Sequence, residues 1–280
     1  IPVPCRASSE CRHQYFPKLY QFSVVFMRLV ILSWFVPEYE VGVDEAGRGP
    51  AIGPLVVCAL SVPRSDRELL IDLGVDDSKR LSKKVRESIY REILSFSESR
   101  AWRVGLEICD PWKIDKWMTT GSLNSLEVEL FADAIKISAE PSEVCSVFLD
   151  ACDVDAGRFG RNVSSKLGKS WAHCLVKSEH QLDSADLIVG AASIIAKVTR
   201  DNEIAKLSRL MGMELGSGYP SDPVTKKAID LLCSSEGPHE ALRWSWANVS
   251  RSWIKQNKRP MPDRFPDSGA PTQSALGDWN

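Results

Sequence analysis

The sequence predicts an α/β fold in which a sheet is flanked by helices and followed by a helical C-terminal appendage. Short apolar runs of strand length alternate along the chain with amphipathic segments of helical period. A Gly/Pro-rich break at 216–223 then separates the last helical segments from the strands. The 280 residues, 44% of them hydrophobic and 26% charged, suffice for a large core. This composition argues against a disordered, collagen-like or polytopic membrane chain.

The first two predicted strands surround a turn rich in glycine and proline. Within 39–45, Val41 and Val43 alternate with more polar or smaller residues, as in a strand. The run 55–62 is continuously apolar, which is typical of a strand buried on both faces. The intervening residues 47–54 contain three glycines and two prolines. The sequence therefore predicts two successive strands with a sharp turn between them.

Helices and strands alternate through the middle of the chain. Ser82 is expected to cap a helix whose apolar residues recur at helical spacing. The segment 102–108 alternates like a strand, and 123–137 has the apolar stripe of an amphipathic helix. Further short strands are predicted over 144–149 and 171–176.

The last third of the sequence is predicted to be helical. Asp186 opens a long helix that is expected to run to about Leu210. Two shorter helices are expected near 223–235 and 239–255. From 257 onward the chain is rich in Pro, Asp, Ser and Gly, which predicts a disordered tail.

Four carboxylates stand at the ends of predicted elements. Asp44 and Glu45 close the first strand, where two adjacent acids are costly to bury unless they are paired or bind metal. Asp150 ends another strand, and Asp186 begins the long helix. Each alone also fits a solvated turn or a helix N-terminal acid. Together they supply four hard oxygen ligands, which suit Mg²⁺ or Mn²⁺ rather than zinc.

Several common catalytic classes lack their motifs. No C-x-x-C pair supports a structural zinc site, and the eight cysteines are expected to be reduced and mostly buried. The glycine-rich turn fits neither the Walker pattern nor G-x-G-x-x-G, because Ile52 takes the place of the required glycine. The sequence also lacks H-E-x-x-H and G-x-S-x-G, so a metalloprotease or a serine hydrolase is unsupported.

Six segments, in order over roughly residues 39–255, resemble the type 2 ribonucleases H (ribonuclease HII). The sequences of these segments are most similar to those of the archaeal and eukaryotic branch. The segments are VGVDEAGRGP at 41–50, DDSKRLS at 76–82, VFLD at 147–150, AD at 185–186, AASIIAKVTRD at 191–201 and GSGYPSDP at 216–223. The resemblance implies a ribonuclease H-like fold with a mixed β-sheet flanked by helices.

The resemblance also implies an endonuclease that produces 5′-phosphomonoesters. Such an enzyme cuts the RNA strand of RNA/DNA hybrids and incises at single ribonucleotides in duplex DNA, in ribonucleotide removal, DNA repair and replication primer removal. Asp44, Glu45, Asp150 and Asp186 match the catalytic carboxylates that hold two divalent ions, Mg²⁺ or Mn²⁺. The expected substrate contacts are Gly47, Arg48, Gly49, Lys79, Ser193, Lys197, Arg200 and Tyr219.

The last residues resemble the motif by which proteins bind a sliding clamp. Gln273, Leu276 and Trp279 fit this pattern, whereas Asn280 replaces its final aromatic residue. We expect an N-terminal extension over 1–37 that is either non-native or disordered and a catalytic domain over 38–210. A helical subdomain over 211–256 and the tail 257–280 would follow. We further expect a monomeric cytoplasmic protein that has no membrane contact.

Two other functions fit the same residues. The first is a different two-metal phosphodiesterase or nuclease, and the second is a catalytically silent nucleic-acid-binding protein on the same fold. The net charge of -2 does not exclude a nucleic-acid partner. It averages the acidic cluster with basic patches that can meet phosphates.

Overall fold

The computed structural model describes residues 38–234 and 236–266 and contains one five-stranded sheet. In chain order the strands are β1 (Tyr39–Ala46), β2 (Leu55–Pro63), β3 (Arg103–Cys109), β4 (Val144–Asp150) and β5 (Leu175–Glu179). Their order across the sheet is β3-β2-β1-β4-β5. β1 pairs antiparallel with β2 and parallel with β4, so the sheet is mixed. The two carboxyl-terminal ends of β1 and β4 therefore lie at one edge of the sheet.

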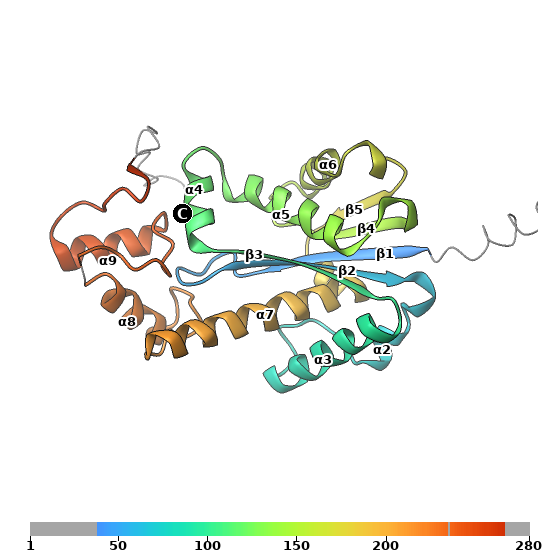
Figure 1. The fold of residues 1–280 in the computed structure, drawn as a ribbon, viewed down its shortest axis with the longest axis horizontal. Coiled ribbons are helices and arrows are strands. Elements are labelled where there is room, and N and C mark those ends of the chain that lie inside the picture. The colour runs from blue at the N-terminus through green and yellow to red at the C-terminus, as the bar shows by residue number, and fades with distance from the viewer. Residues whose placement is uncertain (1–37, 235, 267–280) are drawn as a thin grey trace, which may run out of the picture. The chain divides into compact units, whose positions relative to one another are not determined.

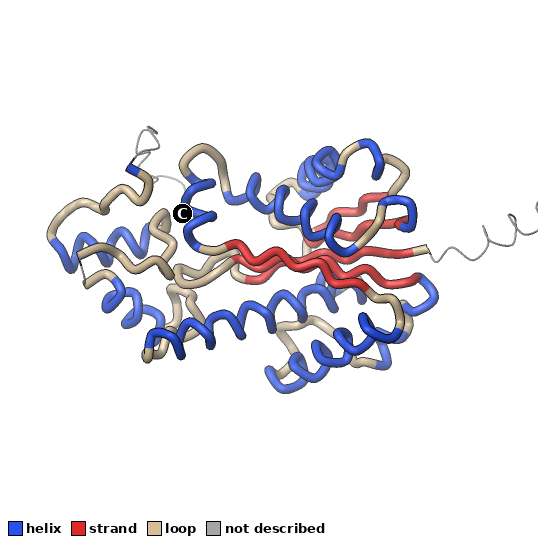
Figure 2. Tube along the Cα trace, in the orientation of Figure 1, coloured by secondary structure: helices blue, strands red, loops and turns tan. Residues whose placement is uncertain are grey.

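Helices cover both faces of the sheet (Figures 1 and 2). On one face lie α5 (Leu123–Ser138) and α6 (Ala156–Leu167), which bury Phe131 and Phe159 against β1 and β4. The opposite face carries α2 (Leu69–Asp72), α3 (Lys83–Ser99) and the long α7 (Leu187–Met211). This arrangement confirms the α/β architecture predicted from the sequence.

β1 alternates between the two layers. Val41 and Val43 are fully buried in the α5/α6 core. Gly42 faces α7, and a Cβ at this position would lie 2.5 Å from the carbonyl carbon of Ile188. The absence of a side chain thus lets α7 approach the central strand. The same alternation sends the next residues, Asp44 and Glu45, to opposite faces of the sheet.

The C-terminal part has a core of its own. α8 (Pro223–Leu232) and α9 (Ala247–Asn257) pack around buried Leu242 and Trp253, and Ile52 from the glycine-rich turn joins them. Ile52 also forms an isolated antiparallel bridge with Leu242. The appendage is thereby fixed to the turn that follows β1.

The remaining helices are short. α4 (Pro111–Met118) follows β3. Single 3-10 turns occupy Arg64–Asp66, Pro141–Glu143, Lys169–Trp171 and Leu182–Ser184. Within the described residues no helix has both the length and the apolar character needed to cross a membrane.

Two predicted elements differ from the structure. The strand expected over 171–176 begins only at Leu175, because the preceding residues form a 3-10 turn. The helix expected over 239–255 begins only at Ala247. The chain before it forms turns on either side of the bridge residue Leu242, where Arg243 donates its backbone N–H to Ala51 and Ala241 accepts from Gly53.

The predicted disorder from 257 onward is wrong for residues 257–266. Trp253 donates its indole N–H to Pro260, at 2.9 Å, which holds the chain against α9. Arg264 forms a buried ion pair with Asp115 of α4, 2.5 Å long, and its guanidinium lies over the ring of Trp244. Residues 1–37 and 267–280 lie outside the described residues.

Candidate active site

Three aspartates meet at the carboxyl-terminal edge of the sheet. Asp44 comes from β1, Asp150 from the end of β4, and Asp183 from the 3-10 turn before α7. One oxygen from each carboxylate lies within 4.8 Å of the others. Asp44 and Asp183 are only 4% exposed, whereas Asp150 is half-buried. Oxygen ligands at this spacing are what Mg²⁺ or Mn²⁺ requires.

Hydrogen bonds fix the orientation of two of these carboxylates. The backbone N–H of Leu182 donates to Asp150, at 2.9 Å, and so ties the end of β4 to the turn that carries Asp183. Ser193 of α7 hydrogen-bonds the carboxylate of Asp44 and also contacts Ser78, at 3.0 Å between the hydroxyl oxygens. The cluster is therefore held by the sheet on one side and by α7 on the other.

The electrostatics of the cluster favour a bound cation. Burial, followed by the charges of Glu45 and Asp150, raises the pKa of Asp44 well above its ordinary value. Burial also raises the pKa of Asp150, and the charge of Asp183 adds to this effect. Like charges at this distance repel one another unless a proton or a metal ion compensates them. The residues present thus fit a divalent metal ion.

Asp186 was expected to be the fourth carboxylate, but it does not join this cluster. One of its oxygens accepts from the backbone N–H groups of Ile188 and Val189, so it caps α7. Its other oxygen pairs with Arg67, which also binds Glu40. The place expected for Asp186 is taken by Asp183. Asp183 was missed in the sequence, where it lies only three residues before Asp186, and the fold of the intervening turn separates the two side chains.

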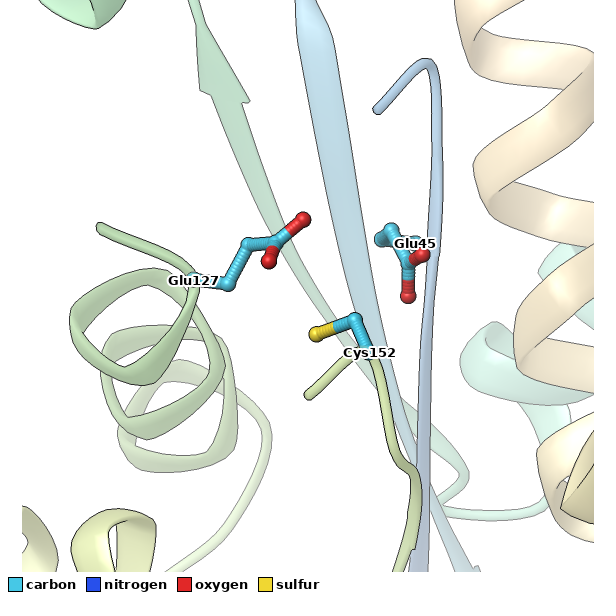
Figure 3. A group of neighbouring side chains, drawn as sticks. All are labelled: Glu45, Glu127 and Cys152. Carbon is cyan, nitrogen blue, oxygen red and sulfur yellow. The ribbon is translucent and has the colours of Figure 1, made fainter. Parts of the chain in front are cut away.

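Glu45, the neighbour of Asp44 on β1, belongs to a second group of ligand atoms and still interacts with Asp44. Its carboxylate lies within 4.8 Å of ligand atoms of Glu127 and Cys152 (Figure 3). Burial, followed by the charge of Asp150, raises the pKa of Glu45. Glu45 therefore interacts electrostatically with the three-aspartate cluster. Glu127 was not predicted as a site residue. The only signal for it in the sequence is an acidic residue beside the apolar stripe of the 123–137 helix.

Lys79 is the basic residue nearest to the cluster. Its ammonium lies 2.9 Å from a carboxylate oxygen of Asp183, while its side chain is 75% exposed. Its charge lowers the pKa of Asp150. Lys79 can therefore meet a phosphate group of a substrate bound at the cluster.

The predicted turn residues 47–49 follow β1 directly. Gly47 has a φ of 97°, in the left-handed region that favours glycine. Arg48 pairs with Glu127 and donates to Asn124, at 2.6 Å, which anchors the turn to α5. Gly49 is exposed, and a Cβ there would lie 3.6 Å from the ring of Tyr219. The turn and Tyr219 thus form one small surface beside the carboxylates.

Arg243 holds this turn in place and was not predicted as a site residue. Its buried guanidinium donates to the carbonyl oxygens of Gly47, Arg48 and Gly53, at 2.6, 3.0 and 3.1 Å. In the sequence, Arg243 is one of several basic residues of the C-terminal region, and no motif distinguishes it from the others. The appendage therefore shapes the candidate site from more than 190 residues away.

Three predicted substrate contacts are placed differently from the expectation. Ser193 is buried beneath Asp44 and cannot meet a substrate directly. Arg200 is 1% exposed and lies over the Tyr219 ring, donating to the carbonyl of Ser217. Lys197 is half-buried and pairs with Asp201, at 2.6 Å. The predicted clamp-binding residues Gln273, Leu276 and Trp279 lie outside the described residues.

Comparison with known proteins gives one family. The model of the ribonuclease HII family matches residues 41–249. The chain belongs to the ribonuclease HII family. The ribonuclease HII of Methanocorpusculum labreanum is 46% identical over 227 residues, which are 80% of this chain and 98% of that protein.

Two solved structures support the same family. Ribonuclease H2 of Pyrococcus horikoshii superposes with a TM-score of 0.70 at 35% identity, covering 79% of this chain and all of that one. Ribonuclease HII of Archaeoglobus fulgidus, solved in a complex with PCNA, gives 0.65 at 34% identity, covering 76% and 96%. The predicted ribonuclease H-like fold is thereby confirmed.

Family membership establishes the class of enzyme. As a ribonuclease HII, the protein is a ribonuclease H, a hydrolase that acts on the RNA of RNA/DNA hybrids. Enzymes of this family use divalent metal ions, and the three-aspartate cluster is consistent with that requirement.

Proposed function

We propose that this ribonuclease HII also incises at single ribonucleotides in duplex DNA. We further propose that two divalent ions, Mg²⁺ or Mn²⁺, are held by Asp44, Glu45, Asp150 and Asp183. The observation that carries this proposal is the three-aspartate cluster lying beside an exposed glycine turn. Asp183 takes the role that was expected for Asp186.

The bound ions would activate a water molecule and stabilise the leaving 3′ oxygen. The protein residues have separate tasks. Asp44, Asp150 and Asp183 hold the ions at the sheet edge, and Ser193 orients Asp44. Lys79 offsets the negative charge of the scissile phosphate. The reaction leaves a 5′-phosphomonoester on the downstream fragment.

Selection for RNA is assigned to the turn 47–49. The 2′-hydroxyl distinguishes RNA from DNA, and the missing side chain at Gly49 lets a sugar approach the main chain. Tyr219 is 37% exposed and lies next to this glycine, so its ring can pack on the neighbouring sugar. Arg48 and Arg243 keep the turn rigid.

A matched pair of variants tests the assignment of the carboxylates. We expect Asp183→Asn to reduce metal-dependent nicking by more than about 100-fold. This loss exceeds that typical of a residue that only hydrogen-bonds a metal ligand. Asp186→Asn should keep nicking within about tenfold and lower Tm instead, because it removes the charge that pairs with Arg67. The assay uses duplex DNA with one ribonucleotide, with and without Mg²⁺.

Three results would contradict the proposed function. Equal cutting of an all-DNA duplex would remove the role of the 2′-hydroxyl. Full activity of Asp44→Asn would remove the role of the cluster. Loss of activity in Asp186→Asn but not in Asp183→Asn would restore the assignment made from the sequence.

We also propose a sliding clamp as a partner through Gln273, Leu276 and Trp279. A homologue at 34% identity was solved with PCNA, which supports this partner. Deleting 273–280 should abolish co-elution with the clamp and leave nicking of short duplexes unchanged. Clamp binding that survives the deletion would refute the role of this motif.

The cellular setting is proposed on the same basis. We assign the protein to ribonucleotide removal, DNA repair and replication primer removal, as a monomer in the cytoplasm. The six cysteines within the described residues are all unpaired, which is typical of a reducing compartment. We keep 38–210 as the catalytic domain and 211–256 as a helical subdomain, supported by the separate core around Trp253.

A further inference from the structure

Glu45, Glu127 and Cys152 form a second group of ligand atoms on the α5 side of the sheet. They come from β1, α5 and the loop after β4, and their ligand atoms all lie within 4.8 Å of one another. In Figure 3, Glu127 reaches from its helix toward the strand that carries Glu45, with the Cys152 sulfur close by. This group shares no residue with the three-aspartate cluster.

Glu127 has one buried carboxylate oxygen that receives no hydrogen bond from the described residues. Its side chain is fully buried, and its Oε2 atom pairs with Arg48. Its Oε1 atom is also buried and accepts no hydrogen bond from any residue that the structure describes. An unpaired buried carboxylate oxygen is costly, and a cation between Glu45 and Cys152 would satisfy it.

The size of the group suits a divalent cation. Three atoms no more than 4.8 Å apart leave a central point at most about 2.8 Å (4.8 Å/√3) from each. Shifts of about 0.5 Å for the sulfur and about 0.7 Å for each oxygen reach Zn–S and Zn–O bond lengths of about 2.3 and 2.1 Å. Cd²⁺ is larger than Zn²⁺ and needs less movement.

The charges select the same class of ion. Once a metal ion displaces the thiol proton, two carboxylates and a thiolate carry three negative charges, and Arg48 offsets one of them. The remaining two match a divalent cation. A sulfur ligand beside two oxygens favours a thiophilic ion such as Zn²⁺ or Cd²⁺ over Mg²⁺.

We propose that Glu45, Glu127 and Cys152 bind a thiophilic divalent cation, which inhibits the nuclease by withholding Glu45 from the catalytic ions. The inhibition rests on the proposed function, because it requires Glu45 to serve those ions. The binding itself does not. As the sulfur–metal bond forms, the thiol of Cys152 gives its proton to solvent, and no electron is transferred.

The binding is tested with metal-free protein and Cd²⁺ alone. Cd²⁺ should produce a thiolate-to-metal charge-transfer band, and Cys152→Ser should remove one cadmium equivalent of it. Cys174→Ser is the matched control, because Cys174 is also half-buried but contacts the carbonyl of Val144 and the ring of His173 and no carboxylate. Asp44→Asn should keep the band, since Asp44 belongs to the other cluster. Glu127→Gln should weaken Cd²⁺ binding at least tenfold.

The inhibition is tested by hydrolysis of an RNA/DNA hybrid in Mg²⁺ with increasing Cd²⁺ or Zn²⁺. Cys152→Ser should need at least tenfold more of either ion for half-inhibition, whereas Cys174→Ser should match the wild type. An unchanged band and unchanged inhibition in Cys152→Ser would overturn the proposal. Should Cys152→Ser not fold, unaltered Cd²⁺ affinity in Glu127→Gln would overturn it equally. A protein that shows the Cys152 band but no hydrolysis would refute the proposed function and leave the site intact.

Discussion

Asp183 and Asp186 are three residues apart, yet they serve different parts of the molecule. Asp183 lies in a 3-10 turn and faces Asp44 and Asp150, whereas Asp186 caps α7 and pairs with Arg67. The sequence predicted Asp44, Glu45, Asp150 and Asp186 as ligands and missed Asp183. A single turn of backbone decides which of the two aspartates points at the sheet edge, and the motif alone does not contain that information.

At the same scale, Asp44 links stability to pH. Its pKa is raised in the folded protein by burial and by Glu45 and Asp150, compared with about 3.9 when unfolded. The stability from this group is therefore complete below about pH 4 and is lost as pH rises through the folded pKa. In metal-free protein, Asp44→Asn should raise Tm at pH 7 by about 2–4 °C per kcal/mol of relieved repulsion.

Thermal unfolding in EDTA at several pH values measures this effect. The difference in Tm between Asp44→Asn and the wild type should shrink toward zero as pH falls to about 4. Adding Mg²⁺ should reverse its sign at pH 7, because only the wild type keeps all the ligands. A difference that stays constant over the whole pH range would contradict this prediction.

At the scale of elements, the packing of α7 on β1 brings the site together. α7 carries Ser193, and the turn before it carries Asp183, so both reach Asp44 only if the helix lies close to the strand. Gly42 permits this approach. Long periodic segments such as 123–137 and 187–210 were predictable, because burial of one stripe determines them. The turns and the isolated bridge over 239–246 were not predictable, because the partners of this segment are distant in the sequence.

Gly42→Ala tests the contact between these two elements. Its Cβ would lie 2.5 Å from backbone atoms of Ile188 and Val189, so the helix has to move. We expect a loss of about 1–3 kcal/mol of unfolding free energy and reduced nicking. Gly157→Ala is the control, because this exposed glycine of α6 has only flexible side-chain atoms nearby, and alanine favours a helix. Equal stability of the two variants would count against the role of this contact.

At the scale of the whole molecule, the chain after α9 returns to the catalytic domain. Arg264 and Asp115 are 9% and 3% exposed in their side chains, and they join the C-terminal segment to α4. The loss of one partner of a buried pair typically costs about 3–5 kcal/mol. Deleting 258–280 should therefore lower Tm by several degrees.

A shorter deletion gives the control for this prediction. Removal of 267–280 keeps Arg264 and should leave Tm within about 1 °C of the full chain. Arg264→Ala in the full chain should reproduce most of the loss. If both deletions unfold at the same temperature, the segment 258–266 does not contribute to stability. The composition of this segment alone predicted disorder. Its order depends on two residues, Pro260 and Arg264, whose partners Trp253 and Asp115 lie outside the segment.

Because of Arg243, the parts of the candidate site form in a definite order during synthesis on the ribosome. All three aspartates of the cluster have been synthesised once the chain reaches residue 183. The Arg243 guanidinium, which hydrogen-bonds the carbonyls of Gly47 and Arg48, is synthesised 195 or more residues after them. Domains fold largely as they emerge, and contacts of such sequence separation form last. We therefore expect a nascent chain to assemble its cation ligands first. The turn that we propose recognises ribose is completed only after residue 243 has been synthesised.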